Sequence, residues 1–180
     1  MSYPLLIVVA VFILRLYFLK ISKRNEARIR QEGGQEFGVE NTKRLTILHI
    51  LFYLGCFVEA FLGQVHLDTI SLVGLMLLVF SMIMLRIVVS LLEGIWTVKL
   101  MVAVNHPFNT HWLFEKVKHP NYYLNIIPEL LGLSLLCHAW VTLIFVSPLY
   151  LYTLYVRIKE ENSVLETIIR PNHNRLAEEG

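Results

Sequence analysis

The sequence predicts an all-α integral membrane protein with five transmembrane helices, of which the last two form a tight hairpin. Hydrophobic residues make up 56% of the 180 residues and charged residues only 17%, whereas soluble domains carry about 25% charged residues. The apolar residues also come in long runs instead of alternating with polar ones. Because lipid offers the backbone no hydrogen-bond partners, such runs are expected to be helices.

Five apolar runs have lengths close to the ~20 residues that an α-helix needs to cross a bilayer. The first run contains Arg15 but has no basic leader region or small-residue cleavage site, so we expect a retained helix and not a signal peptide. The last two runs are short, which predicts tilt or local thinning of the bilayer, and they meet at the hinge Cys137-His138-Ala139. The predicted spans are residues 3–21, 45–62, 69–92, 123–137 and 139–156.

Lysine and arginine are distributed unevenly over the connecting segments. Residues 22–44, 93–121 and 157–180 contain them, whereas the link 63–68 and the hairpin hinge do not. Since basic loops stay on the cytoplasmic side, we expect these three segments to be cytoplasmic and the N-terminus to be outside. An odd number of crossings fits this distribution.

Two of the basic segments have predicted structure of their own. Residues 22–32 indicate a short surface helix that ends at Gly33-Gly34 and whose basic residues bind anionic headgroups. Residues 91–104 mix charged residues into an apolar run around Trp96, which predicts an amphipathic extension of the third helix along the membrane surface. We divide the chain into residues 1–92 with three spans, residues 93–170 with a polar loop and the hairpin, and a polar tail at 171–180.

Arg157, Glu160 and Glu161 form a charged cluster where the last predicted span ends. Arg157 and Glu161 are spaced i, i+4, so they share a helix face, and Glu160 lies beside them. Alone, such a cluster is most often a helix end with a surface ion pair. A functional site requires a second cluster on the same side of the membrane.

Two His-Pro sequences precede the hairpin and supply that second cluster. Proline keeps the preceding residue out of α geometry, so each histidine is expected on a fixed, non-helical backbone. Either turn alone is explained by helix initiation, for which Pro120 is well suited. On the same predicted side as residues 157–161, however, they predict one cytoplasmic pocket. The two sequences are His106-Pro107-Phe108-Asn109 and Lys118-His119-Pro120-Asn121-Tyr122.

The order and spacing of these residues resemble the isoprenylcysteine carboxyl methyltransferase family over roughly residues 80–165. The resemblance implies an enzyme that binds S-adenosylmethionine at the cytoplasmic ends of its last helices. Lys118 stands where the family usually has arginine, and the aromatic, glycine-containing tail that usually follows the two glutamates is missing. The motifs that carry the resemblance are Trp96-Thr97, His106, Thr110, residues 117–122 and residues 157–161.

The resemblance also implies roles for individual residues. Glu161 would bind a cationic or hydroxyl group of S-adenosylmethionine, and Arg157 would hold the acidic group of the substrate. A carboxylate acceptor needs no base because it is ionised at pH 7, whereas an enol or phenol would be helped by Glu160 or His119. The expected catalytic residues are Arg157 and Glu160, and the expected cofactor-binding residues are Lys99, His106, Pro107, Phe108, Asn109, Phe114, Lys118, His119, Pro120, Asn121, Tyr122 and Glu161.

We therefore expect a membrane O-methyltransferase for a carboxylate or acidic hydroxyl of a lipophilic substrate, such as a prenylcysteine, a fatty lipid or a polyketide. One alternative is a nicotinamide-dependent membrane lipid reductase. Another is an adaptor or transporter in which Glu59 and Arg86 mark a conduction path, although pairing between helices or snorkelling explains these residues more simply. The expected partners are membrane lipids, without nucleic acid or an obligate protein partner, and no histidine or cysteine spacing predicts a metal.

Overall fold

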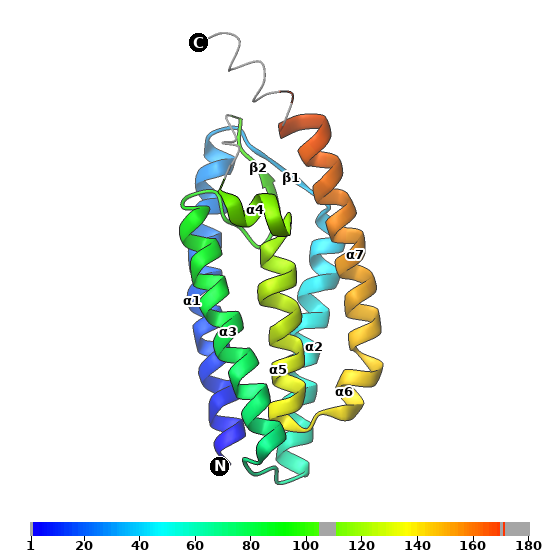
Figure 1. Ribbon diagram of the computed structural model, residues 1–180. Helices are drawn as coiled ribbons and strands as arrows, with labels where there is room; N and C mark the ends of the chain where they lie inside the picture. The colour runs from blue at the N-terminus through cyan, green and yellow to red at the C-terminus, as the bar shows by residue number, and fades with distance from the viewer. Residues whose placement is uncertain (1, 105–110, 170, 172–180) are drawn as a thin grey trace.

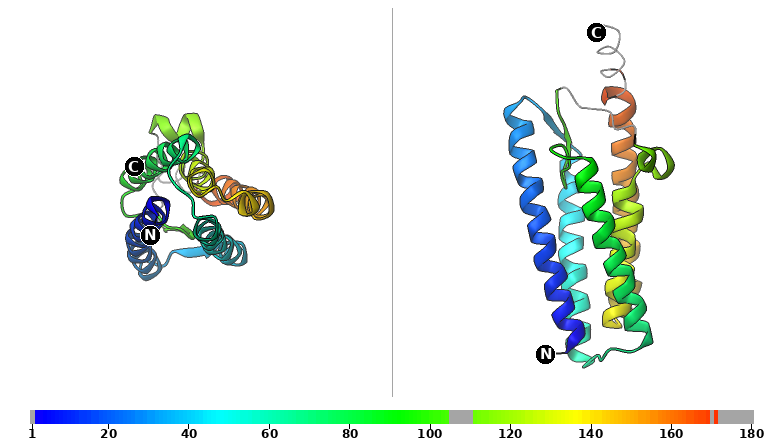
Figure 2. Two further views of the ribbon diagram at one scale, coloured as in Figure 1. Left: turned by 90° about the horizontal axis from the view of Figure 1, so that it is seen from below. Right: turned by 60° about the vertical axis from the view of Figure 1, so that its left-hand side comes forward.

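Three long helices form the frame of the molecule. The structure, a computed structural model, describes residues 2–104, 111–169 and 171. The helices α1 (Tyr3–Gln31), α2 (Val39–Leu62) and α3 (Thr69–Leu91) are each long and apolar enough to cross a membrane. They run side by side along the long axis of the bundle, with the N-terminus at the lower end (Figures 1 and 2).

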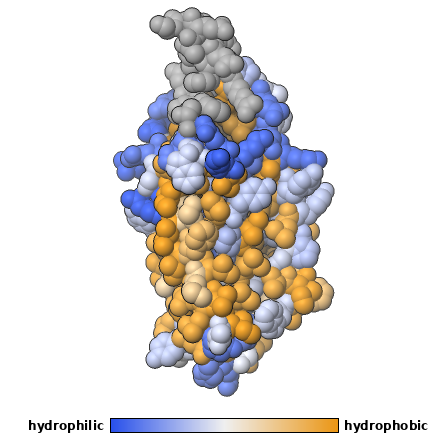
Figure 3. All heavy atoms as spheres, in the orientation of Figure 1, coloured by the Kyte–Doolittle hydropathy of each residue, from blue (hydrophilic) through white to orange (hydrophobic). Residues whose placement is uncertain are grey.

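The outer surface of this frame is apolar. Large exposed side chains, among them Ile13, Leu54 and Met76, occur on all three helices. Figure 3 shows a hydrophobic belt over most of the bundle, with hydrophilic residues gathered mainly at the upper end. A monomeric soluble protein rarely exposes so large an apolar surface. The structure therefore agrees with the membrane protein that the composition predicts.

A helical hairpin packs against the frame. The chain reverses at the predicted hinge, where His138 adopts a positive φ of 49°. The three long helices meet the criteria for a span, while crossing of the membrane by the hairpin stays a prediction. The first arm of the hairpin consists of the π-helical turn η1 (Asn121–Ile126) and α5 (Ile127–Cys137), and the second of α6 (Trp140–Phe145) and α7 (Ser147–Val164).

The second arm is not the single helix that was predicted over residues 139–156. It is interrupted at Val146, between α6 and α7. Pro148 lies in the first turn of α7 and has no N–H group to donate to the preceding turn. The hydrogen-bond ladder of α6 therefore ends there, and a new helix begins.

Two local predictions at the upper end of the bundle are wrong. The stretch 22–32 is not a separate surface helix, because α1 continues without a break to Gln31 and ends before Gly33. Residues 91–104 are not an amphipathic helix either. Instead, α3 ends at Leu91, and Gly94 turns the chain with a φ of 80°, a conformation in which glycine has no steric penalty.

A small sheet replaces the predicted amphipathic helix. β2 (Leu100–Val102) pairs antiparallel with β1 (Gln35–Phe37), so that Phe37 lies opposite Leu100. All three residues of β2 are buried, and this burial explains why the apolar run does not lie along the membrane surface. The short helices α4 (Trp112–Val117) and η2 (Leu165–Ile169) complete this end of the molecule (Figure 1).

α3 and α5 approach each other closely at Gly74 and Gly132. A Cβ atom on Gly74 would lie 2.6 Å from the carbonyl oxygen of Gly132, so a side chain at this position would force the helices apart. Small residues permit this kind of close contact between membrane helices. The contact also joins the predicted parts 1–92 and 93–170 into one bundle.

Arg15 and Glu129 form an ion pair inside the bundle. Arg15 Nε donates to Glu129 Oε1 at 2.7 Å, and Arg15 Nη2 donates to Asn125 Oδ1 at 2.9 Å. The hydroxyl of Tyr53 also donates to Glu129, which is fully buried. An unpaired charge at this depth would be costly, and the pair joins α1, α2 and α5.

Glu59 has a structural role in place of the conduction path considered above. Its carboxylate accepts hydrogen bonds from the backbone N–H groups of Val141 at 3.0 Å and Thr142 at 2.7 Å. These are free N–H groups at the start of α6, where a negative charge is favourable. The transporter alternative therefore gains no support from this residue.

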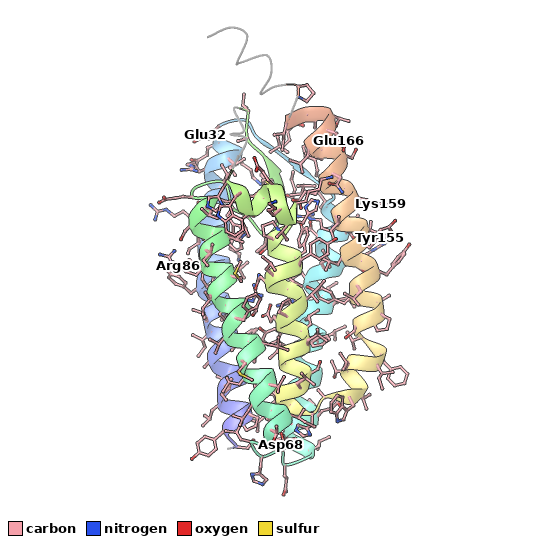
Figure 4. All side chains as sticks on the ribbon, in the orientation of Figure 1. Glu32, Asp68, Arg86, Tyr155, Lys159 and Glu166 are labelled. Atoms are coloured by element: carbon pink, nitrogen blue, oxygen red, sulfur yellow. The ribbon has the colours of Figure 1, made fainter. Side chains whose placement is uncertain are left out.

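Near the hinge, Asp68, Ser71 and His138 lie close together without forming a catalytic triad. His138 Nε2 is 3.3 Å from Ser71 Oγ and 3.1 Å from Asp68 Oδ1. In a triad the histidine contacts its two partners through different ring nitrogens, whereas here both contacts use Nε2. The cluster ties the start of α3 to the hinge (Figure 4 shows Asp68 at this lower end).

Replacing Arg15 by leucine should destabilise the protein by on the order of 3 kcal/mol, because Glu129 would remain buried without its counter-charge. The double variant Arg15→Leu/Glu129→Leu should lose less stability than Arg15→Leu alone. Denaturant unfolding of the detergent-solubilised protein, followed by circular dichroism, measures both. Arg24→Leu, at an exposed position of the same helix, is the control. Equal stability of Arg15→Leu and wild type would contradict the structural role of the pair.

Candidate functional site

A cavity of about 510 Å³ lies at the upper end of the bundle. Its volume is within the range of small-molecule sites, roughly 300–1,000 Å³. The end of α3, the strand β2, α4, η1 and the C-terminal part of α7 with η2 contribute its lining. Figure 4 shows one lining residue, Glu166, at this end of the molecule. The two polar clusters of the sequence therefore meet at one cavity.

Glu161 is held by residues of the turn before the hairpin. Its Oε1 lies 3.1 Å from His119 Nδ1, and its Oε2 accepts a hydrogen bond of 2.5 Å from the hydroxyl of Tyr122. The other ring nitrogen of His119, Nε2, lies 3.0 Å from Asn162 Oδ1. Pro120, which follows His119, starts η1 and leads the chain directly into the hairpin. We call these contacts of Glu161 the Glu161 clasp.

The clasp favours a charged His119. Both ring nitrogens face side-chain oxygens, which only the doubly protonated imidazolium can satisfy as a donor at each nitrogen. Burial opposes this charge, but the hydrogen bond and negative charge of Glu161 outweigh burial and raise the pKa of His119. For Glu161, burial opposes ionisation, but the hydrogen bond and charge of His119 hold its pKa below the ordinary value. Each of the two groups therefore stabilises the charged form of the other.

Arg157 lies beside the clasp and is almost completely buried. Its Nη1 donates to Thr42 Oγ1 at 2.8 Å, its Nη2 to the carbonyl oxygen of Val98 at 3.2 Å, and its Nε to the hydroxyl of Tyr122 at 3.3 Å. These contacts connect α7 with the start of α2, the segment before β2, and η1. The guanidinium therefore has a fixed position in the cavity wall.

Most predicted site residues that the structure describes line this one cavity. The exception is Glu160, whose Oε2 instead accepts a hydrogen bond of 3.2 Å from Asn41 Nδ2 on α2. Consecutive residues of an α-helix are about 100° apart, and at this position the rotation turns Glu160 toward α2 while Glu161 and Asn162 line the cavity. His106, Pro107, Phe108 and Asn109 lie outside the described residues. The predicted residues in the lining are Lys99, Phe114, Lys118, His119, Pro120, Asn121, Tyr122, Arg157 and Glu161.

Lys99 lines the cavity but is also bound by two carboxylates. Its Nζ lies 2.7 Å from Glu26 Oε1 and 3.2 Å from Glu36 Oε2. The hydrogen bond to Glu26 is the main cause of the raised pKa of Lys99. The lysine therefore connects the C-terminal part of α1 with the sheet. This structural role was not predicted, and the predicted contact with a cofactor stays a prediction.

Several residues of the site were not predicted from the sequence. Thr42 and Asn162 each contact a predicted residue directly. Asn162 follows Glu161 and could have been included as part of the same motif, whereas Thr42 is far from Arg157 in the chain and carries no local signal. Trp96 was expected at the membrane interface and as part of a motif, but not among the site residues. Its Nε1 is buried and has no hydrogen-bond acceptor among the described residues, and its side chain lines the cavity.

The cavity lining combines cations and aromatic rings with the carboxylates of Glu115, Glu161 and Glu166. Phe114, Tyr122 and Trp96 supply rings, which attract cations over their faces. Lys118 adds a positive charge near the rim. Among the described residues, no group of histidine, cysteine, aspartate and glutamate side chains could hold a metal ion. The lining is suited to an organic molecule that has both charges and an aromatic ring.

Comparison with known proteins identifies similar sequences. The model of the Isoprenylcysteine carboxyl methyltransferase (ICMT) family matches residues 73–167, which include all described residues of the Glu161 clasp. An uncharacterised protein from Haemophilus influenzae is 42% identical over 84% of this chain and 88% of its own length. The uncharacterised protein YpbQ from Bacillus subtilis is 26% identical over 89% of this chain and 95% of its own length. No solved structure matches significantly.

The His119–Glu161 pair should make stability depend on pH within a defined window. Its contribution, on the order of 1 kcal/mol, is complete between the ordinary pKa values of 4.5 for Glu161 and 6.5 for His119. It is lost as pH rises through the raised pKa of His119, and also as pH falls through the lowered pKa of Glu161. Thermal unfolding midpoints of wild type and His119→Asn, measured as a function of pH, test this.

The difference between the two proteins should be largest inside the window and shrink on either side of it. His138→Asn is the control, because His138 also faces a carboxylate but lies at the opposite end of the bundle. A difference that does not change with pH would mean that His119 contributes packing and no charge.

Proposed function

The chain belongs to the isoprenylcysteine carboxyl methyltransferase family, a family of membrane methyltransferases, and we propose that it transfers a methyl group from S-adenosylmethionine to an acidic oxygen of a lipophilic substrate. The observation that carries this proposal is the Glu161 clasp. It presents a fixed carboxylate to a cavity that is built within the region matched by the family.

The described lining fits the chemical groups of S-adenosylmethionine. When bound, this molecule supplies a methyl group on a positively charged sulfur. Glu161 matches its ammonium group or ribose hydroxyls, and Lys118 matches its carboxylate. The rings of Phe114 and Tyr122 suit the adenine and the sulfonium charge, while the unpaired Nε1 of Trp96 is available to an acceptor atom.

Arg157 is suited to hold the acidic group of the acceptor substrate. Arginine has five N–H donors, and its three described hydrogen bonds use one donor each, which leaves two. Two donors on one guanidinium can bind a carboxylate at both oxygens. Because the other three bonds keep the guanidinium in place, the acceptor would be oriented without further ordering of this side chain.

A carboxylate is the acceptor that this site favours over an enol or phenol. A neutral hydroxyl would need a base, and of the two bases expected from the sequence Glu160 faces α2 instead of the cavity. His119 does line the cavity, but Glu161 raises its pKa and makes it less available as a proton acceptor. A carboxylate is ionised at pH 7 and needs neither residue.

The position of the cavity fits a reaction between a polar donor and a lipid. The cavity lies at the hydrophilic end of the bundle, next to the hydrophobic belt (Figure 3). Under the positive-inside rule, the basic segments at this end support a cytoplasmic position for the cavity and an N-terminus outside. The polar donor would then enter from the cytoplasm and the substrate from the bilayer.

A transfer assay with S-adenosylmethionine labelled in its methyl group tests the proposed function. The reconstituted protein should label lipids that carry a carboxylate, and the panel should include prenylcysteine, long-chain fatty acids and acidic polyketide lipids. The corresponding lipid alcohols are the matched controls. Transfer to none of these acids, or lipid reduction that depends on a nicotinamide cofactor, would overturn the proposal.

Replacing Glu161 by glutamine should weaken binding of S-adenosylhomocysteine by about 10- to 100-fold, because a charged hydrogen-bond partner is lost. Isothermal titration calorimetry on the detergent-solubilised protein measures this change. Glu40→Gln is the control, since Glu40 lies at the same end of the molecule but outside the cavity and is exposed. Equal affinity of Glu161→Gln and wild type would remove Glu161 from the binding site.

A further inference from the structure

A second hollow, separate from the cavity, lies on the membrane-facing side of the frame between α1 and α3. It encloses about 460 Å³, and every residue of its lining except Arg86 is apolar. We call it the α1–α3 groove. Its lining residues are Val11, Leu14, Leu75, Leu78, Val79, Met82, Ile83, Arg86 and Ile87.

The groove runs along α3 in the direction of a lipid chain. Its lining on this helix extends from Leu75 to Ile87, which corresponds to about 18 Å at 1.5 Å per residue. One leaflet contributes about half of the ~30 Å hydrocarbon core. The groove therefore has about the length of an acyl chain in one leaflet.

Arg86 lies toward the hydrophilic end of this groove. Figure 4 shows it in the upper half of α3, nearer to the polar end of the bundle than to Asp68. Along the membrane normal, the groove thus has a cation near the interface and an apolar surface toward the bilayer centre. A membrane phospholipid has the same order, with its phosphate above its acyl chains.

Arg86 also lacks an internal counter-ion. It is exposed within a candidate membrane span and forms no salt bridge with any residue that the structure describes. The other arginine within the apolar part of a span, Arg15, is paired with Glu129. A charge at such a position is expected to have a partner, and the negative headgroups of the surrounding lipids are the available source.

We propose that the α1–α3 groove binds an anionic phospholipid, with the phosphate on Arg86 and one acyl chain along α3. A guanidinium binds phosphate through two parallel hydrogen bonds. The acyl chain would contact only apolar side chains below Arg86. The site is a structural lipid site on the outside of the bundle.

The groove is separate from the proposed methyltransferase cavity. No residue lines both. A cluster that includes Phe18, Leu85 and Trp96 closes the bundle at the upper end, and Phe18 meets Trp96 edge-on at 6.4 Å between ring centroids. Lipid binding in the groove can therefore be tested without methyl transfer, and the failure of one proposal leaves the other intact.

Native mass spectrometry of the protein released from nanodiscs tests this inference. The nanodiscs contain phosphatidylcholine with a minor fraction of phosphatidylglycerol. Wild type should retain phosphatidylglycerol in preference to phosphatidylcholine, and Arg86→Gln should lower that preference about fivefold, the factor expected for one basic residue near an anionic surface. Arg44→Gln should retain the preference, because Arg44 is an exposed arginine at the polar end of α2 and does not line the α1–α3 groove.

A second pair of variants tests the groove itself. Val79→Trp fills the groove and should reduce the retained phosphatidylglycerol, whereas Val73→Trp, at another exposed position of α3, should not. Circular dichroism confirms that both variants are folded. The proposal is overturned if wild type shows no preference for phosphatidylglycerol, if Arg44→Gln and Arg86→Gln behave alike, or if Val79→Trp retains as much lipid as Val73→Trp.

Discussion

The Glu161 clasp is the interaction on which the architecture of the polar end depends. A single carboxylate accepts from Tyr122 and pairs with His119, so the last long helix is bound to the turn that starts the hairpin. Arg157, one helical turn earlier, binds the same tyrosine and adds contacts to Thr42 and Val98. These contacts join segments from four regions of the chain, and three of them (α7, η1 and the segment before β2) line the cavity.

A second polar connection leads from the cavity into the membrane-embedded part. Asn121 lines the cavity and accepts a hydrogen bond of 3.1 Å from Asn125, whose own side-chain oxygen accepts from Arg15 at 2.9 Å. Arg15 in turn pairs with Glu129. Because polar side chains inside the membrane have to find partners within the protein, this series of hydrogen-bonded side chains has few alternative arrangements. The ion pair between α1 and α5 therefore helps to fix the position of Asn121 in the cavity.

The sequence predicted well those features that depend on local pattern. The hydrophobic runs located the three long helices, and the residues Cys137-His138-Ala139 located the hairpin turn, because length and composition are sufficient for both. Arg157 and Glu161 share a helix face by their spacing, and the structure places both in the cavity lining. The remaining errors have a different origin. The strand β2 forms because β1, far away in the chain, offers a pairing edge, and no local pattern in residues 91–104 contains that information.

The difference between Glu160 and Glu161 shows the limit of reading a motif as a unit. Both are adjacent carboxylates near one arginine, and both were expected in one site, with Glu161 as a cofactor ligand and Glu160 as a catalytic residue. The helical rotation of about 100° per residue turns Glu160 toward Asn41 and Glu161 toward His119, so only one of these two glutamates lines the cavity. Glu161 also raises the pKa of His119, which makes the second expected base less available as a proton acceptor. On the proposed function, a fixed arginine beside these two residues favours an acceptor that arrives already ionised, and this preference follows from which face of one helix each glutamate occupies.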